Sequence, residues 1–255
     1  MVKIATPISH LFENKKYAKE IMEHSDCLEC RDESLSSPLL NQEVFHCELQ
    51  PIHKLTKLNF KYLELLKQNK RDLKLLTFHV ASSCDRPYLK NGIFEKGGKE
   101  YTEKEALKNA KMNFRKIRSI FNKNIKIAIE NANYYPTNAY KYVTDASFIS
   151  RIVNENNIDF VFDIAHARIT AHNKEIDYEE YKYSLPIDKA IQTHISSFKV
   201  LQNHLAYDAH EYPKTRELAE VKGLLKNVGV RYLTVEYYKN IRYLMHSLKL
   251  LRELI

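Results

Sequence analysis

The amino-acid sequence predicts an α/β fold, a (β/α)8 TIM barrel with room for one irregular or missing unit. Three observations predict it. Strand-like apolar runs alternate with helix-like amphipathic runs along the whole chain, which is typical of a parallel sheet. Seven or eight such units fit into 255 residues, a usual length for this barrel. No linker, repeat or low-complexity tract divides the sequence, so we expect a single domain over residues 1–255.

Eight short apolar runs are the expected strands, and apolar residues at helical spacing mark the helices between them. The expected strands span residues 2–9, 27–31, 44–49, 73–81, 125–131, 158–164, 190–196 and 232–236. The expected helices span residues 13–24, 55–66, 102–121, 148–156, 213–229 and 241–251. Thr102 and Glu105 have the spacing of a capping box at the start of one helix. Pro213 suits the first turn of another.

A long loop is expected over residues 82–101, where three of the five glycines lie. Loops of this length in compact domains are often lids or binding loops. We therefore expect this segment to cover a site.

The net charge of +8 and a pI near 9.1 raise the prospect of an anionic partner such as DNA. The cations that could contact phosphates from loops are Arg86, Lys90, Lys96, Lys99, Arg168 and Lys199. Helices with solvated polar faces account for the same excess, and we favour that explanation. No apolar run reaches the length of a membrane span, and the first residues lack a signal-peptide pattern. We expect a cytoplasmic protein that does not enter the membrane.

Side chains that bind metals recur at the ends of the expected strands. They are His46, His79, Glu130, Asp163, His166, His194, Asp208, His210 and Glu236. In a TIM barrel the carboxyl ends of all strands meet at one mouth, where catalytic groups gather. Imidazole and carboxylate are ligands for zinc, iron or manganese. A shared metal cluster is the prediction, because burying ionisable groups repeatedly is costly without a partner.

Two short motifs carry most of this signal. In Asp163-Ile-Ala-His166 the strand supplies a carboxylate and the following turn an imidazole. Asp208-Ala-His210 places both side chains on one side of an extended segment. Each motif alone has a plainer interpretation: Asp163 capping the next turn, or an ordinary loop pair. A single histidine such as His46 is more often a hydrogen-bonded core residue. The joint order of the nine favours the metal cluster.

The ligand order resembles that of endonuclease IV, a trinuclear zinc enzyme of the xylose-isomerase-like TIM-barrel superfamily that acts at abasic DNA. On that resemblance the nine residues hold three metal ions, with Glu130 as a bridging ligand; with the second resemblance below, we expect two or three divalent ions. Glu130, Asp163 and Glu236 are then the expected catalytic residues. The glycine-rich DNA loop expected after the D-x-H motif is replaced by Glu211-Tyr-Pro213.

Several segments resemble a second branch, the multinuclear non-heme iron-dependent oxidative enzymes of the methanobactin-biosynthesis type. They are Glu130-Asn131 with Tyr134, residues 168–173, Leu185-Pro186 followed by His194, and Asp208-Ala-His210. That resemblance implies iron, dioxygen and a peptide substrate held by a partner protein. His166 stands where this family usually has asparagine, and Ser196-Ser197 replaces its glycine.

Four functions remain open from the sequence. The favoured one is an iron-dependent oxidase or oxygenase acting on a peptide or a small sulfur- or nitrogen-containing substrate, which Arg168 and Asn133 would orient. The alternatives are a zinc-dependent phosphodiesterase on abasic DNA, a sugar isomerase or epimerase, and a barrel that only binds a ligand. The metals in the purified protein separate the first two, and a sugar-phosphate screen tests the third.

Overall fold

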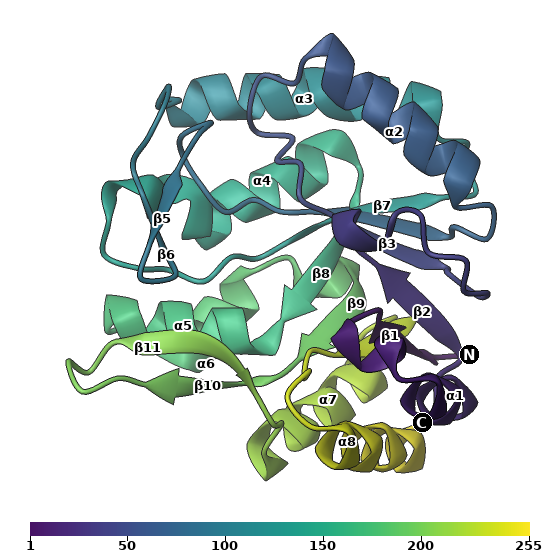
Figure 1. The fold of residues 1–255 in the computed structure, drawn as a ribbon. Helices are drawn as coiled ribbons and strands as arrows, with labels where there is room; N and C mark the ends of the chain where they lie inside the picture. Colours follow the sequence, from purple (N-terminus) through teal and green to yellow (C-terminus); the bar gives the residue numbers. More distant parts are fainter.

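The computed structural model describes residues 1–255 and has eight parallel strands closed into a barrel (Figure 1). The order around the barrel is β1-β12-β9-β8-β7-β4-β3-β2. The barrel strands are β1 (Lys3–Pro7), β2 (Cys27–Cys30), β3 (Val44–Cys47), β4 (Leu75–Phe78), β7 (Lys126–Glu130), β8 (Asp159–Asp163), β9 (Ala190–Ile195) and β12 (Tyr232–Val235). All eight pairings are parallel, so the predicted fold class is confirmed.

Helices surround the barrel, with α2 and α3 on one side and α7 and α8 on the opposite side in Figure 1. The helices are α1 (Lys15–His24), α2 (Lys57–Asn69), α3 (Glu103–Ile120), α4 (Ala146–Asn156), α5 (Ile164–Lys174), α6 (Tyr178–Ser184), α7 (Thr215–Asn227) and α8 (Ile241–Leu254). Between β2 and β3 the chain forms only the short 3-10 helix η2 (Asp32–Ser34). This is the irregular unit that the sequence left room for.

The barrel interior is closed by one layer of side chains, with a single residue from each strand. The layer consists of Ala5, Cys27, Val44, Leu75, Ala128, Val161, Ile191 and Tyr232. A larger apolar core fills the space between the strands and the helices. Because the interior is packed, as in other TIM barrels, a ligand can reach the strands only at their ends.

Helix boundaries follow local capping in two instructive cases. Thr102 accepts a hydrogen bond from Glu105 N, and the Glu105 carboxylate accepts one from Thr102 N, so the predicted capping box is present. The prediction for Pro213 was wrong. Helix α7 begins at Thr215, its N-cap is Lys214, and Lys214 N donates to the Glu217 carboxylate. Pro213 therefore lies outside the helix.

Two hairpins that the sequence did not predict rise on the same side of the barrel (Figure 1). The loop after β4 contains β5 (Tyr88–Lys90) and β6 (Ile93–Glu95), and the segment after β9 forms β10 (Ser197–Val200) and β11 (Ala206–Glu211). The turn at Gly92 of the first hairpin packs against the Tyr207 hydroxyl of the second. The hairpins therefore meet beside the barrel mouth.

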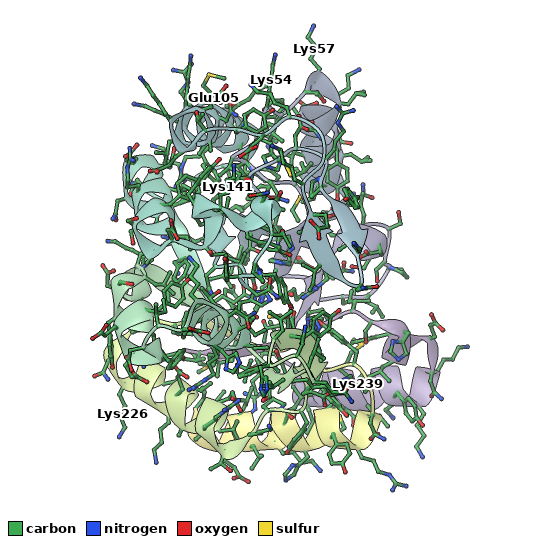
Figure 2. All side chains as sticks on the ribbon, turned by 90° about the vertical axis from the view of Figure 1, so that its left-hand side faces the viewer. Lys54, Lys57, Glu105, Lys141, Lys226 and Lys239 are labelled. Atoms are coloured by element: carbon green, nitrogen blue, oxygen red, sulfur yellow. The ribbon has the colours of Figure 1, made fainter.

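None of the helices combines the length and the apolar character that crossing a bilayer requires. Positive charge is spread over the periphery, and the labelled Lys57 and Lys226 point outward at opposite ends of the view in Figure 2.

Candidate metal centre

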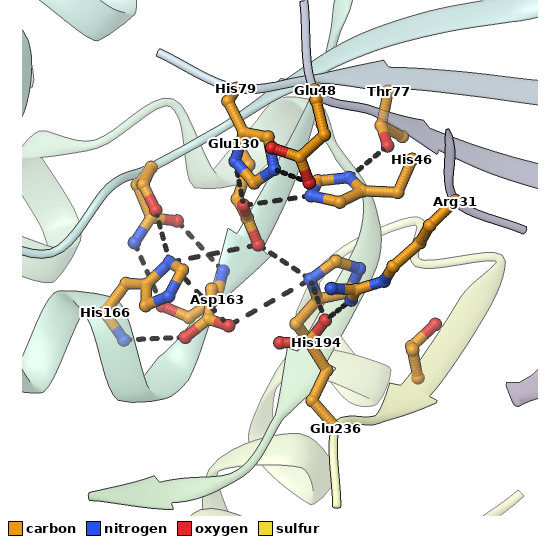
Figure 3. A network of polar contacts seen from close by, with 12 residues as sticks. Arg31, His46, Glu48, Thr77, His79, Glu130, Asp163, His166, His194 and Glu236 are labelled. Carbon is orange, nitrogen blue, oxygen red and sulfur yellow. Dashed lines mark hydrogen bonds and ion pairs between the residues drawn. The ribbon is translucent and has the colours of Figure 1, made fainter. Parts of the chain in front are cut away.

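The nine predicted residues lie together at the carboxyl ends of the barrel strands. Figure 3 labels those of the set that come from the barrel strands and α5: His46, His79, Glu130, Asp163, His166, His194 and Glu236. His46 and His194 are within β3 and β9, and Glu130 and Asp163 end β7 and β8. His79 and Glu236 directly follow β4 and β12, His166 is in the first turn of α5, and Asp208 and His210 are in β11. The hairpin β10–β11 thus adds two side chains of β11 to those that the barrel strands provide.

Glu130 is at the middle of the network (Figure 3). Its Oε2 lies 3.4 Å from His46 Nε2 and 3.3 Å from His79 Nδ1. Its Oε1 lies 2.7 Å from His194 Nδ1 and 3.9 Å from His166 Nδ1. The two oxygens of one buried carboxylate thus face two different sets of imidazoles.

Asp163 and His166 form the local pair that the sequence singled out. Asp163 Oδ1 accepts a hydrogen bond from His166 N at 2.6 Å, which caps α5. Asp163 Oδ2 is buried without a hydrogen-bond partner and lies 3.8 Å from His166 Nδ1 and 4.0 Å from His194 Nδ1. One oxygen therefore caps a helix while the other points into the cluster.

Asp208 and His210 join the cluster from the hairpin. Asp208 Oδ2 lies 3.3 Å from His166 Nε2, and His210 Nε2 lies 3.4 Å from Glu236 Oε2. His210 adopts a positive φ of 42°, a backbone conformation that is uncommon for a side chain of this kind. Such strain persists where surrounding contacts impose it, and it occurs often at functional sites.

Each of four histidines has one ring nitrogen held on the outer side of the cluster. His46 Nδ1 is 2.6 Å from Thr77 Oγ1, and His79 Nε2 is 3.5 Å from a Glu48 oxygen. His166 Nδ1 is 2.9 Å from the Asn131 carbonyl. The fourth, His194, has Nε2 3.3 Å from Glu29 Oε2. A ring nitrogen held in this way orients the other nitrogen, which is how metal-binding histidines are usually supported.

The protonation of the cluster follows from burial and from its charges. Burial alone would lower the pKa of His79, but hydrogen bonds to Glu130 and Glu48 raise it to about 9. Burial likewise opposes the charges of Glu29 and Glu130, which raise the pKa of His194 to about 10. Burial raises the pKa of Asp163 to about 6. Imidazolium charges thus compensate buried carboxylates in the protein without ions.

The donor set fits bound cations. Three groups bring their ligand atoms within 4.8 Å of one another: His46–His79–Glu130, Glu130–Asp163–His166 and Glu29–His194–Glu236. Nitrogen and oxygen donors suit zinc, iron or manganese. The unpartnered Asp163 Oδ2 is the kind of buried acceptor that a cation would satisfy.

Sequence reasoning missed three residues of this network. Glu29 is fully buried in β2, Arg31 contacts both Glu29 and Glu236, and Glu48 contacts His79. The signal for Glu29 was present, because a carboxylate stands inside the apolar run Cys27–Cys30.

The match to a protein-family model identifies the family of this chain. The model of the RiPP precursor modification enzyme MbnB/TglH/ChrH matches residues 100–253, which is more than half of the chain. The chain belongs to the MbnB/TglH/ChrH family. Its matched part contains Glu130, Asp163, His194, Asp208 and Glu236, so the resemblance based on those segments is confirmed. The family is one of enzymes that modify RiPP precursors.

Two curated relatives of this MbnB/TglH/ChrH protein match over shorter stretches. A UPF0276 protein of Acaryochloris marina is 27% identical over 88 residues, 34% of this chain and 32% of that protein. A UPF0276 protein of Nitrosospira multiformis is 24% identical over 110 residues, 43% of this chain and 38% of that protein. The matched parts therefore span about a third of the length of these relatives.

Solved structures share the fold of this MbnB/TglH/ChrH protein at low sequence identity. A 3-keto-D-glucoside 4-epimerase from E. coli has a TM-score of 0.65 and 13% identity, covering 100% of this chain and 99% of the epimerase. A D-tagatose 3-epimerase-like protein has a TM-score of 0.63 and 20% identity, covering 98% and 96%. These neighbours confirm the TIM-barrel fold and carry no information on substrate.

Of the two residues expected to orient a substrate in this family member, the structure brings only Asn133 near the cluster. Asn133 Nδ2 donates to the Tyr135 hydroxyl, which accepts from Asp208 N. Arg168 lies elsewhere in this structure. Arg168 Nη2 donates to Glu220 Oε2 at 2.6 Å, among the outer helices. It lies two residues after His166 in α5, and two residues turn a helix to its other face.

The cations near the mouth that suggested a DNA footprint are largely paired with carboxylates. Lys96 contacts Glu100, Lys99 Nζ lies 2.9 Å from Glu105, and Lys199 Nζ lies 2.8 Å from Glu211. Because each of these charges has a carboxylate beside it, they do not form a basic surface for phosphates. For this MbnB/TglH/ChrH protein the net charge is thus a weak argument for nucleic acid.

Proposed function

We propose that this protein is a multinuclear metal enzyme, with iron as the favoured metal, that oxidatively modifies a peptide. Membership of a family of RiPP precursor modification enzymes supports the peptide substrate. The nitrogen and oxygen donors gathered at the barrel mouth support the metal dependence. A small sulfur- or nitrogen-containing substrate fits the same cluster but has no support from the family.

The observation that carries the proposal is the position of Glu130. One oxygen faces His46 and His79, and the other faces His194, at distances of 2.7 to 3.4 Å. A carboxylate whose two oxygens face separate ligand sets is suited to bridge two ions. A site for a single ion would leave the ligands on one side of Glu130 without an ion.

The ligand assignment follows from the side on which each residue lies. His46 and His79 would hold an ion with Glu130 Oε2, while Asp163, His194 and Glu236 would hold one with Glu130 Oε1. His166, Asp208 and His210 would hold a third. Iron ions in these places would supply the electron-transfer chemistry with dioxygen that amino-acid side chains lack.

Protein groups around the cluster have their own tasks in the proposed reaction. Asp163 uses Oδ1 to cap α5, so its buried Oδ2 is free to hold an ion without disturbing the helix. Asn133 and the Tyr135 hydroxyl stand beside Asp208 and can orient a peptide amide. The two hairpins, which meet at Gly92 and Tyr207, would flank a peptide bound beside the mouth.

Elemental analysis of protein purified without oxygen tests the proposal. We expect about two to three iron equivalents per chain in the wild type, and a loss of at least one equivalent in Glu130→Gln. The matched control is Glu217→Gln, which alters a fully buried carboxylate among the outer helices and should leave the iron content unchanged.

Three results would contradict the proposal. Zinc near three equivalents without iron would favour hydrolysis of a phosphodiester, which an abasic-site duplex would then test. No stoichiometric metal would favour a barrel that only binds a ligand. An unchanged iron content in Glu130→Gln would remove the bridging role.

A further inference from the structure

Glu29 is a fully buried carboxylate that neither the predicted ligand set nor the family description includes. It lies in β2, and its Oε2 accepts hydrogen bonds from Gln192 Nε2 at 2.6 Å and Thr234 Oγ1 at 3.2 Å. The same oxygen lies 3.3 Å from His194 Nε2. Three neighbours from β9 and β12 therefore fix the place of this carboxylate.

Glu29 faces the edge of the His194 ring that points away from Glu130. His194 Nε2 faces Glu29, whereas Nδ1 lies 2.7 Å from Glu130, 3.5 Å from Glu236 and 4.0 Å from Asp163. The ring is thus held between one outer carboxylate and a group of inner ones. His46 is held in the same manner by Thr77, His79 by Glu48 and His166 by the Asn131 carbonyl.

A role for Glu29 as a metal ligand would need space for a cation between Glu29 and Glu236. Arg31 already fills this role, because its Nη2 lies 3.3 Å from Glu29 Oε1 and also contacts Glu236. The guanidinium charge lies where it balances both carboxylates. Glu29 therefore has its cation and remains outside the proposed cluster.

We propose that Glu29 is a positioning residue that holds His194 with Nδ1 directed at the metal centre. The inference rests on the proposed function, since it assigns Glu29 a task toward that same centre. Gln192 and Thr234 fix the Glu29 carboxylate 3.3 Å from His194 Nε2, an ion-pair contact without hydrogen-bond geometry. An outer carboxylate in this place favours the proton on Nε2 and leaves Nδ1 for the metal. Without it, the ring is free to turn, and the site loses part of its preorganisation.

Titration of the metal-free protein with Co²⁺ under argon, followed by visible absorption and competition with a chelator, tests the inference. We expect Glu29→Ala to bind Co²⁺ roughly tenfold to hundredfold more weakly than the wild type, with an altered absorption spectrum. Glu29→Gln keeps an accepting oxygen and should lie between the two. If Glu29→Ala does not fold, the comparison of Glu29→Gln with the wild type decides the matter.

The matched control is Glu43→Gln. Glu43 is a carboxylate that pairs with Lys3 at 2.6 Å just before β3, at the opposite end of the barrel from the cluster. It should lower the melting temperature without changing Co²⁺ affinity or spectrum. Wild-type affinity and spectrum in both Glu29 variants would overturn the positioning role alone. A wild type that takes up no stoichiometric Co²⁺ or iron would overturn the proposed function, and the positioning role with it.

Discussion

Asp163 and His166 are joined by a hydrogen bond that starts a helix beside the candidate metal centre. Asp163 Oδ1 accepts from His166 N at 2.6 Å, so the carboxylate is the N-cap of α5. The other oxygen, Oδ2, is buried, unpartnered and 3.8 Å from His166 Nδ1. The helix cap and the metal ligand, which are alternative interpretations of the sequence, are thus compatible because each uses a different oxygen.

Asp163→Asn should separate these two tasks. Asparagine caps a helix as well as aspartate does, but it brings no negative charge to the cluster. Because burial raises the pKa of Asp163 to about 6, the carboxylate is ionised at pH 7 but its buried charge lowers the stability of the fold. We expect metal-free Asp163→Asn to melt at or above the wild-type temperature, and its metal content to fall by at least one equivalent.

Asp163→Ala is the comparison variant, since it removes both the cap and the carboxylate. It should lose about 1 kcal/mol of stability relative to Asp163→Asn and bind equally little metal. Thermal unfolding and elemental analysis of the two variants give the result. Wild-type metal content in Asp163→Asn would contradict the ligand role.

Metal uptake should strengthen as the pH rises from 7 to about 10. In the metal-free protein, hydrogen bonds and carboxylate charges overcome burial and raise the pKa of His79 to about 9 and that of His194 to about 10. Both rings are therefore in the doubly protonated imidazolium form at pH 7. A metal ion must displace one proton from each ring that it binds. Above these pKa values the competition ends, so the affinity should level off.

Calorimetry in two buffers of different ionisation enthalpy measures the protons released on Co²⁺ binding. We expect release of about one to two protons per chain at pH 7 and fewer near pH 10. An affinity that does not change between pH 7 and 9 would show that these histidines are not displaced from their protons and are not ligands.

The sequence predicted the barrel and the candidate centre well because both depend on a local pattern. Apolar runs mark the strands, and a titratable residue at the end of a run stands out against them, as Glu130 and His194 do. A parallel barrel then brings all strand ends together whatever the details of the connections.

The elements that the sequence did not predict depend on distant contacts. Helix α5 shows no single apolar stripe because it is covered on several sides: it packs against α6, β9 and the hairpin β10–β11. The buried position of the Glu29 carboxylate depends on contacts with Gln192, His194 and Thr234, which are more than 160 residues away along the chain. Neither relationship leaves a local signal.

Gly92→Ala should destabilise the contact between the two hairpins. Gly92 has a φ of +76°, and a Cβ there would overlap the Tyr207 hydroxyl. Left-handed backbone costs a residue with a side chain roughly 1–2 kcal/mol, and the displaced tyrosine adds to that.

Gly223→Ala is the control, because its Cβ would meet nothing within 4 Å in the interior of α7. It should stabilise the protein by about 0.5–1 kcal/mol. Urea unfolding measures both, and equal effects of the two variants would contradict the close contact.

Arg168→Met should lower stability and leave metal binding unchanged. Arg168 Nη2 donates to Glu220 Oε2 at 2.6 Å, and its guanidinium lies 4.0 Å from the ring centre of Tyr178. Its removal leaves the largely buried Glu220 with fewer donors, which costs roughly 1–3 kcal/mol for a charged hydrogen bond.

Arg151→Met is the matched control for Arg168→Met. Arg151 is half exposed and pairs with Glu103 and Glu155 on the surface, where such pairs contribute about 0–1 kcal/mol. Denaturant unfolding and elemental analysis of both variants measure the outcome. Because Arg168 and His166 leave α5 on opposite faces, only a structural effect is expected from the Arg168 variant. A loss of bound metal at wild-type stability would contradict this expectation and connect Arg168 to the centre.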